Sequence, residues 1–313
     1  MEKTFETPGD VRLYVENEVG HVAISTGVTE ATQVTLEPDT AGAEELIGRA
    51  TVECRTSGRR HMVVVKIPRQ GMRFMRRNGV TVRVDLPQGS DVNVMAGSAD
   101  VDINGPVGTA ELATSSGDIT ADDVVGDFES KTASGDIIVG AVGGDLKVHT
   151  ASGDLRCSAV AGRSMFATAS GDLEVGAAEN QVEVKATSGD VRLGELAHGA
   201  RVQNVSGDIR VLALGEGTLH VPDGGVQAVD PHCAHGARGR LELSVHDVLD
   251  HERTIRRGEE LAESHAPDRL VAVGQVARTL QELVVLHQGA RWELAPQGGD
   301  PFPLAHEVHF GLA

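Results

Sequence analysis

The chain has 313 residues, of which 40% are hydrophobic and only 3% are aromatic. It carries 46 aspartates and glutamates against 28 lysines and arginines, which gives a formal net charge of −18. Nucleic-acid binding needs a basic face, so this balance argues against a nucleic-acid partner.

The beginning of the chain shows no export signal. The opening MEKTFETPGD has neither an apolar stretch nor a small-residue cleavage site. No run of eighteen apolar residues follows anywhere, so no membrane-spanning helix is expected. The cysteines, which are Cys54, Cys157 and Cys233, are too scattered for a disulfide framework. We therefore expect a reduced, cytoplasmic protein.

Residues 1–95 are expected to form an irregular β cap. Apolar and polar side chains alternate over residues 11–15, which is typical of a strand with one buried face, and residues 63–67 and 80–86 are read as further strands. A stacked β fold needs an end that covers its open edge. This segment precedes the repeat described below and is placed to provide that cover.

A basic loop with apolar residues interrupts these strands. It contains Arg69, Arg73, Phe74, Met75, Arg76 and Arg77. Arginines interleaved with Phe and Met suit the surface of an anionic membrane, and they equally suit an acidic protein partner. The alternative is an exposed hairpin loop whose charges keep it soluble.

Residues 96–219 contain a strict repeat of eighteen residues. Ser-Gly-Asp occurs six times at this spacing, and each copy is followed by Ile, Leu or Val. Two alternating apolar segments, separated by Gly or polar residues, make each unit read as strand, turn, strand, turn. The aspartates of the six copies are Asp118, Asp136, Asp154, Asp172, Asp190 and Asp208.

Two arrangements could use this unit: a meander of antiparallel hairpins, or coils stacked in parallel. Identical residues at identical offsets favour stacking, because stacking places like side chains in columns. Thr132, Thr150 and Thr168 would form one such column. We predict an all-β protein built on a β-solenoid of stacked 18-residue coils, each rising about 4.8 Å.

The six aspartates have two interpretations. In the structural one, Ser and Asp side chains accept backbone N–H bonds in a tight turn, where Gly supplies a positive φ. In the functional one, carboxylates stacked about 4.8 Å apart form a column that binds calcium. The Gly-Gly-x-Gly-x-Asp pattern of calcium-binding β-rolls is missing. We favour the structural role and keep the cation column as the alternative.

Residues 220–313 differ in composition from the rest. They hold nine of the 13 His and six of the 11 Pro. One interpretation is a small helical domain, with helices over 245–264 and 269–288. The other is a disordered or frameshifted tail, because a GC-rich gene translated out of frame gains Arg, His, Ala and Pro.

The recurrent Thr-Ala-Ser-Gly-Asp-(Ile/Leu) motif, with alternating apolar residues and a Gly in mid-unit, resembles a bacterial β-strand-repeat family. That family is labelled "putative adhesin" and catalogued as a domain of unknown function. The resemblance covers about residues 5–220. It implies a β-solenoid-like fold and, in some relatives, a link to cell-envelope stress responses. It implies no catalytic residues.

These observations favour a non-enzymatic interaction scaffold or sensor with a protein partner, linked through the resemblance to envelope stress. No Gly-rich phosphate loop, Gly-x-Ser-x-Gly elbow or His-Glu-x-x-His motif is present, so we expect no catalytic residues, no cofactor and no metal. Peripheral contact with an anionic membrane through the basic loop is a further expectation. The alternatives are a surface adhesin and a cation-binding module similar to a β-roll.

Overall fold

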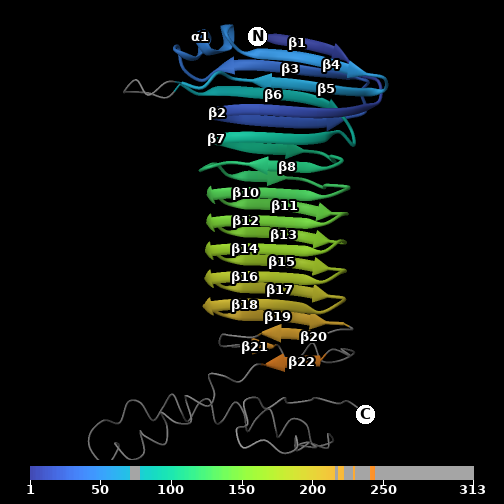
Figure 1. Ribbon diagram of the computed structural model, residues 1–313, viewed down its shortest axis with the longest axis vertical. Coiled ribbons are helices and arrows are strands. Elements are labelled where there is room, and N and C mark those ends of the chain that lie inside the picture. The colour runs from blue at the N-terminus through green and yellow to red at the C-terminus, as the bar shows by residue number, and fades with distance from the viewer. Residues whose placement is uncertain (71–77, 216–217, 222–227, 230–239, 244–313) are drawn as a thin grey trace, which may run out of the picture.

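The computed structural model describes residues 1–70, 78–215, 218–221, 228–229 and 240–243. Over these ranges the strands wind into a column of stacked coils, whose long axis is vertical in Figure 1. Each coil contributes one strand to each of two sides, here called face A and face B. Face A consists of β8 (Ala110–Ala113), β10 (Phe128–Ser134), β12 (Leu146–Ser152), β14 (Ser164–Ser170), β16 (Val182–Ser188), β18 (Ala200–Ser206), β20 (Thr218–Val221) and β22 (Arg240–Leu243). Face B consists of β9 (Ile119–Ala121), β11 (Ile137–Val142), β13 (Leu155–Val160), β15 (Leu173–Ala178), β17 (Val191–Leu196), β19 (Ile209–Leu214) and β21 (Ala228–Val229).

Neighbouring strands within each face are parallel, and in the repeat they pair at the spacing of the motif. Thr132 pairs with Thr150, and Thr150 pairs with Thr168, so these three residues form the predicted column. A meander would pair consecutive strands in antiparallel fashion, whereas β10 pairs with β12 and β11 with β13. The prediction of a β-solenoid is therefore confirmed.

The core lies between the two faces and follows from the alternation of side chains along each strand. On face B, the residues that follow the aspartates and those two positions further on are all buried; they are Ile119, Ile137, Leu155, Leu173, Val191, Ile209, Ala121, Val139, Cys157, Val175, Leu193 and Val211. Face A meets them with Phe128, Leu146, Val148, Phe166, Val182, Val184 and Val202. Burying one such Val, Leu, Ile or Phe side chain stabilises the fold by about 2 kcal/mol.

The N-terminal end is closed by a cap in which the strand order changes. Its elements are β1 (Glu2–Glu6), β2 (Asp10–Gly27), β3 (Ala31–Pro38), α1 (Ala43–Gly48), β4 (Thr51–Ser57), β5 (Arg60–Lys66), β6 (Val80–Pro87) and β7 (Asp91–Asn104). β2 and β7 each run through both faces and pair in parallel. Beyond β2, strand β5 continues face A and β6 continues face B, and the antiparallel strands β4, β3 and β1 follow. These strands confirm the predicted β cap. The cap also contains the helix α1, which buries Ala43, Leu46 and Ile47 at this end (Figure 1).

The glycines of the Ser-Gly-Asp turns are required by the contact between coils. Gly153, Gly171, Gly189 and Gly207 have φ values between 120° and 147°, which L side chains rarely adopt. A Cβ on any of the four would also overlap the carbonyl oxygen of the glycine one coil earlier. The turns can therefore stack only where this column has no side chain.

The parallel ladder continues after the last Ser-Gly-Asp. β20 pairs with β18, β21 with β19 and β22 with β20. β20 thus spans the predicted boundary between residues 219 and 220. The predicted helices over 245–264 and 269–288 lie outside the described residues, and the division of the chain into three parts stays a prediction. Within the described ranges, no helix has the length and apolar character needed to cross a membrane.

We predict that Gly171→Ala lowers the free energy of unfolding by about 2 kcal/mol or more, through backbone strain and overlap with Gly153. Gly27→Ala is the matched control, because a Cβ there meets no atom within 4 Å. Urea unfolding of the two variants measures the difference. Equal stabilities of the two variants would show that the stacking of the turns does not require glycine at this position.

Candidate functional site

The aspartate column is tied into the fold by hydrogen bonds from one coil to the next. The Oδ1 atom of Asp118 accepts the backbone N–H of Asp136 at 2.9 Å, and Asp136 accepts that of Asp154 in the same way. The ladder continues to Asp208 with distances of 2.9 to 3.1 Å. Sequence reasoning predicted that these carboxylates accept backbone N–H groups in their own turn. In the structure the donor belongs to the following coil.

Arginines lie beside the later members of the column. Arg192 approaches Asp190 at 3.0 Å and Asp172 at 3.6 Å, while Arg210 lies 3.6 Å from Asp208. The described residues contain no ion pair to Asp118 or Asp136. Charge along the column is therefore compensated mainly toward its C-terminal end.

The cation-binding alternative for this column stays a prediction. In the part of the chain that the structure describes, no three His, Cys, Asp or Glu residues are grouped in a way that could hold a metal ion. The hydrogen bonds between coils give the carboxylates of this ladder a structural role that needs no cation.

Only the base of the predicted basic loop lies within the described residues. Arg69 donates to the Oε1 atom of Glu16 at 3.2 Å, and the Gln70 backbone N–H donates to Glu18 at 3.0 Å. The Gln70 side chain also bonds both backbone groups of Asn78, at 2.6 and 2.9 Å, which joins the two ends of the loop. Arg73, Phe74, Met75, Arg76 and Arg77 lie outside the described residues, and their binding role stays a prediction.

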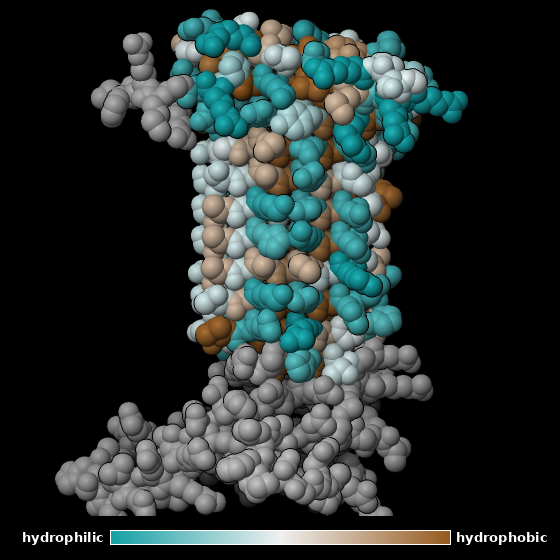
Figure 2. All heavy atoms as spheres, viewed as in Figure 1, coloured by the Kyte–Doolittle hydropathy of each residue, from teal (hydrophilic) through white to brown (hydrophobic). Residues whose placement is uncertain are grey.

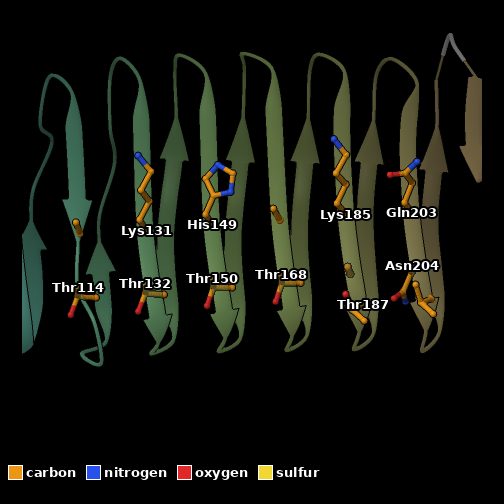
Figure 3. Close-up of a pocket in the computed structure, with 14 residues that line it drawn as sticks. Thr114, Lys131, Thr132, His149, Thr150, Thr168, Lys185, Thr187, Gln203 and Asn204 are labelled. Carbon is orange, nitrogen blue, oxygen red and sulfur yellow. The ribbon is translucent and has the colours of Figure 1, made fainter.

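A feature that sequence reasoning missed is a shallow groove along face A, with a volume of about 930 Å³. Two ranks of side chains line most of it (Figure 3). The first rank contains Lys131, His149, Ala167, Lys185 and Gln203. The second contains Thr114, Thr132, Thr150, Thr168 and Asn204. Each rank occupies a constant offset before the aspartates, so the sequence could have shown which residues share a rank, although not that the two ranks enclose a groove.

The groove has a different charge from the protein as a whole. None of the described residues that line it is an aspartate or a glutamate, although the net charge is −18. Lys131 bonds Glu129 at 2.6 Å and Lys185 bonds Glu183 at 2.7 Å, both just beside the groove. The hydrogen bond to Glu129 raises the pKa of Lys131 and lowers that of Glu129. Lys131 is therefore held in the charged form.

A second, smaller hollow lies on the cap in line with this groove. It is lined in part by Tyr14, Met62 and Val64, and the Lys66 ammonium lies 5.0 Å from the centre of the Tyr14 ring. The two hollows belong to one continuous face, because β7 pairs with β8 through Met95 and Ala113. Figure 2 shows that polar and apolar side chains gather in columns along the long axis.

Cys157 faces the core on β13 and is not positioned as a nucleophile. It is 3% exposed, and burial raises the pKa of its thiol to about 12. Since the thiolate is the reactive form, this side chain is inert at neutral pH. Cys54, on β4, is only partly buried.

The stacked parallel coils, the capped end and the outward ranks of side chains define a β-solenoid with a grooved face. The chain belongs to the Toastrack DUF4097 family, whose model matches residues 12–221. This confirms the resemblance seen in the Ser-Gly-Asp motif. No curated protein matches the chain.

Several solved structures are similar to this chain at low identity. A "putative adhesin" from Parabacteroides distasonis is 11% identical with a TM-score of 0.37, over 77% of this chain and 92% of that one. A "putative adhesin" from Bacteroides fragilis is 12% identical with a TM-score of 0.35, over 71% and 96%. A "putative cell adhesion protein" from Clostridium sporogenes is 11% identical with a TM-score of 0.26, over 71% and 98%. The family and these structures carry the names of adhesins or of a domain of unknown function, and none is named as an enzyme.

The names of these structures correct the expected location. We predicted a cytoplasmic protein from the absence of an export signal in the first residues. These structures are named as adhesins or as a cell adhesion protein, which contradicts the predicted cytoplasmic location, and that prediction is withdrawn.

We predict that Asp136→Ala lowers the free energy of unfolding by about 1 to 2 kcal/mol, because the Asp154 N–H loses its acceptor. Asp136→Asn is the matched control, since it keeps the acceptor oxygen and relieves repulsion between neighbouring carboxylates. Its stability is expected to equal or exceed that of the wild type. Thermal and urea unfolding measure both variants, and equal losses would assign the effect to charge.

A second prediction concerns the thiols. Iodoacetamide at pH 8 is expected to leave Cys157 unmodified in the folded protein, since burial raises the pKa of this thiol well above that pH. Unfolding in urea returns the pKa to its ordinary value and permits modification. Peptide mass mapping reports each cysteine separately, with Cys54 as the partly exposed comparison. Rapid modification of Cys157 without urea would show that the core opens at β13.

Proposed function

We propose that this protein is a non-enzymatic scaffold that binds a protein partner along face A. The observation that supports the proposal is the groove, which combines outward side chains from β8 to β18 into one recess. Strands β10 to β18 stay in register at a constant spacing, so the partner would meet ranks of side chains held at fixed intervals. A surface adhesin would use the same face. It would differ from the proposed scaffold only in the location of its partner.

Face A is also suited to binding by its physical character. The groove combines methyl groups from Ala113 and Ala167 with the polar side chains of Lys131, Lys185 and Gln203. A recess with an apolar floor and polar groups at fixed places is the usual form of a recognition site. Rigid surfaces lose little conformational entropy on binding, which favours affinity.

The function is tested by blocking the groove. Ala167→Arg places a long side chain in the groove on β14, whereas Ala177→Arg makes the same change on β15 of face B. Both alanines are partly buried strand residues, so the two variants are matched in chemistry and environment. Circular dichroism and thermal unfolding first establish that both variants fold.

We expect the tagged, full-length wild type and Ala177→Arg to recover the same cross-linked partners from fractionated native extract. Ala167→Arg is expected to recover them at least about tenfold less efficiently, as measured by quantitative mass spectrometry. Equal recovery by both variants would remove face A from the proposed function.

A further inference from the structure

We propose that the groove of face A recognises an extended acidic peptide segment whose carboxylates are spaced four residues apart. This inference rests on the proposed function and names the chemistry of the partner. It depends on three observations: the charge of the groove, the spacing of its lysines and the way in which those lysines are held.

The charge of the groove selects the sign of the ligand. Among the described residues that line it, the ionisable ones are Lys131, His149 and Lys185. In a chain with a net charge of −18, this recess presents cations and neutral groups to an anionic ligand. Repulsion from the rest of the molecule is weakened because charges more than about 8 Å apart are screened at physiological ionic strength.

The spacing of the lysines selects the form of the ligand. Register pairs connect Lys131 through His149 and Ala167 to Lys185, so the two lysines are three coils apart. Three strand separations amount to about 14 Å. Four residues of an extended peptide span about 13 Å, and residues four apart project on the same side. Acidic residues at positions i and i+4 of one extended segment can therefore reach both lysines.

The lysines are able to exchange partners. Each bonds a glutamate at the surface, and side-chain exposures of 56% for Lys131 and 54% for Lys185 place both pairs in solvent. Ion pairs as exposed as these contribute little to stability, so they exchange readily. When Lys131 turns to a ligand, Glu129 still has Lys147 at 3.6 Å. Glu183 likewise has a second cation nearby. The hydrogen bond from Lys185 is the main cause that lowers the pKa of Glu183, and the charge of Arg201 lowers it further.

The neutral lining fits a peptide better than a sugar. Thr168 and Gln203 supply a hydroxyl and an amide group suited to a peptide backbone. No Phe, Tyr or Trp is among the described residues that line this groove, so it lacks the aromatic surfaces on which sugar rings stack. An acidic polysaccharide is therefore the less favoured occupant, and the experiment below includes it.

The test uses the full chain and three labelled nine-residue peptides of identical composition, built from alternating Thr and Val with two Glu. The glutamates are placed two, four or five residues apart, and binding is followed by fluorescence anisotropy at low and physiological salt. We expect the peptide with a separation of four to bind at least about tenfold more tightly than the other two. A separation of five directs the carboxylates to opposite sides, and a separation of two is too short.

Variants locate the binding. The double variant Lys131→Gln with Lys185→Gln is expected to lose about tenfold or more in affinity for the preferred peptide. Arg156→Gln with Arg210→Gln is the matched control, because it removes the same charge from two residues that lie three coils apart on face B and do not line the groove. Equal affinities for all three peptides, or equal losses in both double variants, would overturn the proposal in favour of unspecific charge attraction.

The outcomes of the two experiments separate this inference from the proposed function. If polygalacturonate binds, is lost in the groove variant and outcompetes every peptide, the acidic-peptide proposal is overturned while face A remains a binding surface. If no peptide binds but Ala167→Arg alone abolishes partner recovery, the inferred ligand is wrong and the scaffold stands. If both experiments give no difference between groove and control variants, both proposals are wrong.

Discussion

The parallel backbone ladder between successive coils is the interaction on which the rest of this structure depends. Each strand of the repeat pairs with the strand eighteen residues away, for example at Thr132 and Thr150. This pairing satisfies the backbone groups of both faces and brings equivalent residues together. An inserted residue within a strand would shift that strand by one position against its neighbours, whereas a turn can take up an extra residue. β18 and β20 show this, because Ala200 pairs with Leu219 at a spacing of nineteen residues instead of eighteen. The constant spacing of Ser-Gly-Asp keeps both the strands and the turns of the repeat in line.

Stacking turns each position of the repeat into a line with a single chemical character. The glycines form a line in which no side chain fits between turns, as at Gly153 and Gly171. The aspartates from Asp118 to Asp190 form a line of acceptors, because the Oδ1 of each accepts the N–H of the aspartate in the next coil. The same principle extends to the outer surface. One line of side chains carries Lys131 and Lys185, and the groove follows it. The turns and the groove of this protein thus have a common origin.

The cap shows how an open ladder is ended. An exposed edge strand can pair with another chain, so natural sheets protect their edges. Here the parallel order gives way to antiparallel strands, and α1 covers the end of the core with Leu46 and Ile47. The last strand, β1, exposes charged residues such as Lys3, whose Nζ bonds the carbonyl of Val52 on β4. The solenoid is thereby prevented from extending at its N-terminal end, and its long faces remain the surfaces available to a partner.

The sequence by itself determined the repeating unit, the buried positions and the stacked arrangement, because period and alternation are local properties that stacking preserves. Ile137 and Leu155 could be assigned to the core from their places after the aspartates alone. Tertiary structure decided which atom each carboxylate bonds, since the donor of Asp136 belongs to Asp154, one coil away. It also decided the helix over the cap and the groove, because a recess depends on how neighbouring ranks of side chains lie in space. Alternation predicts which side chains point outward, but only the packed coils show where side chains enclose a groove.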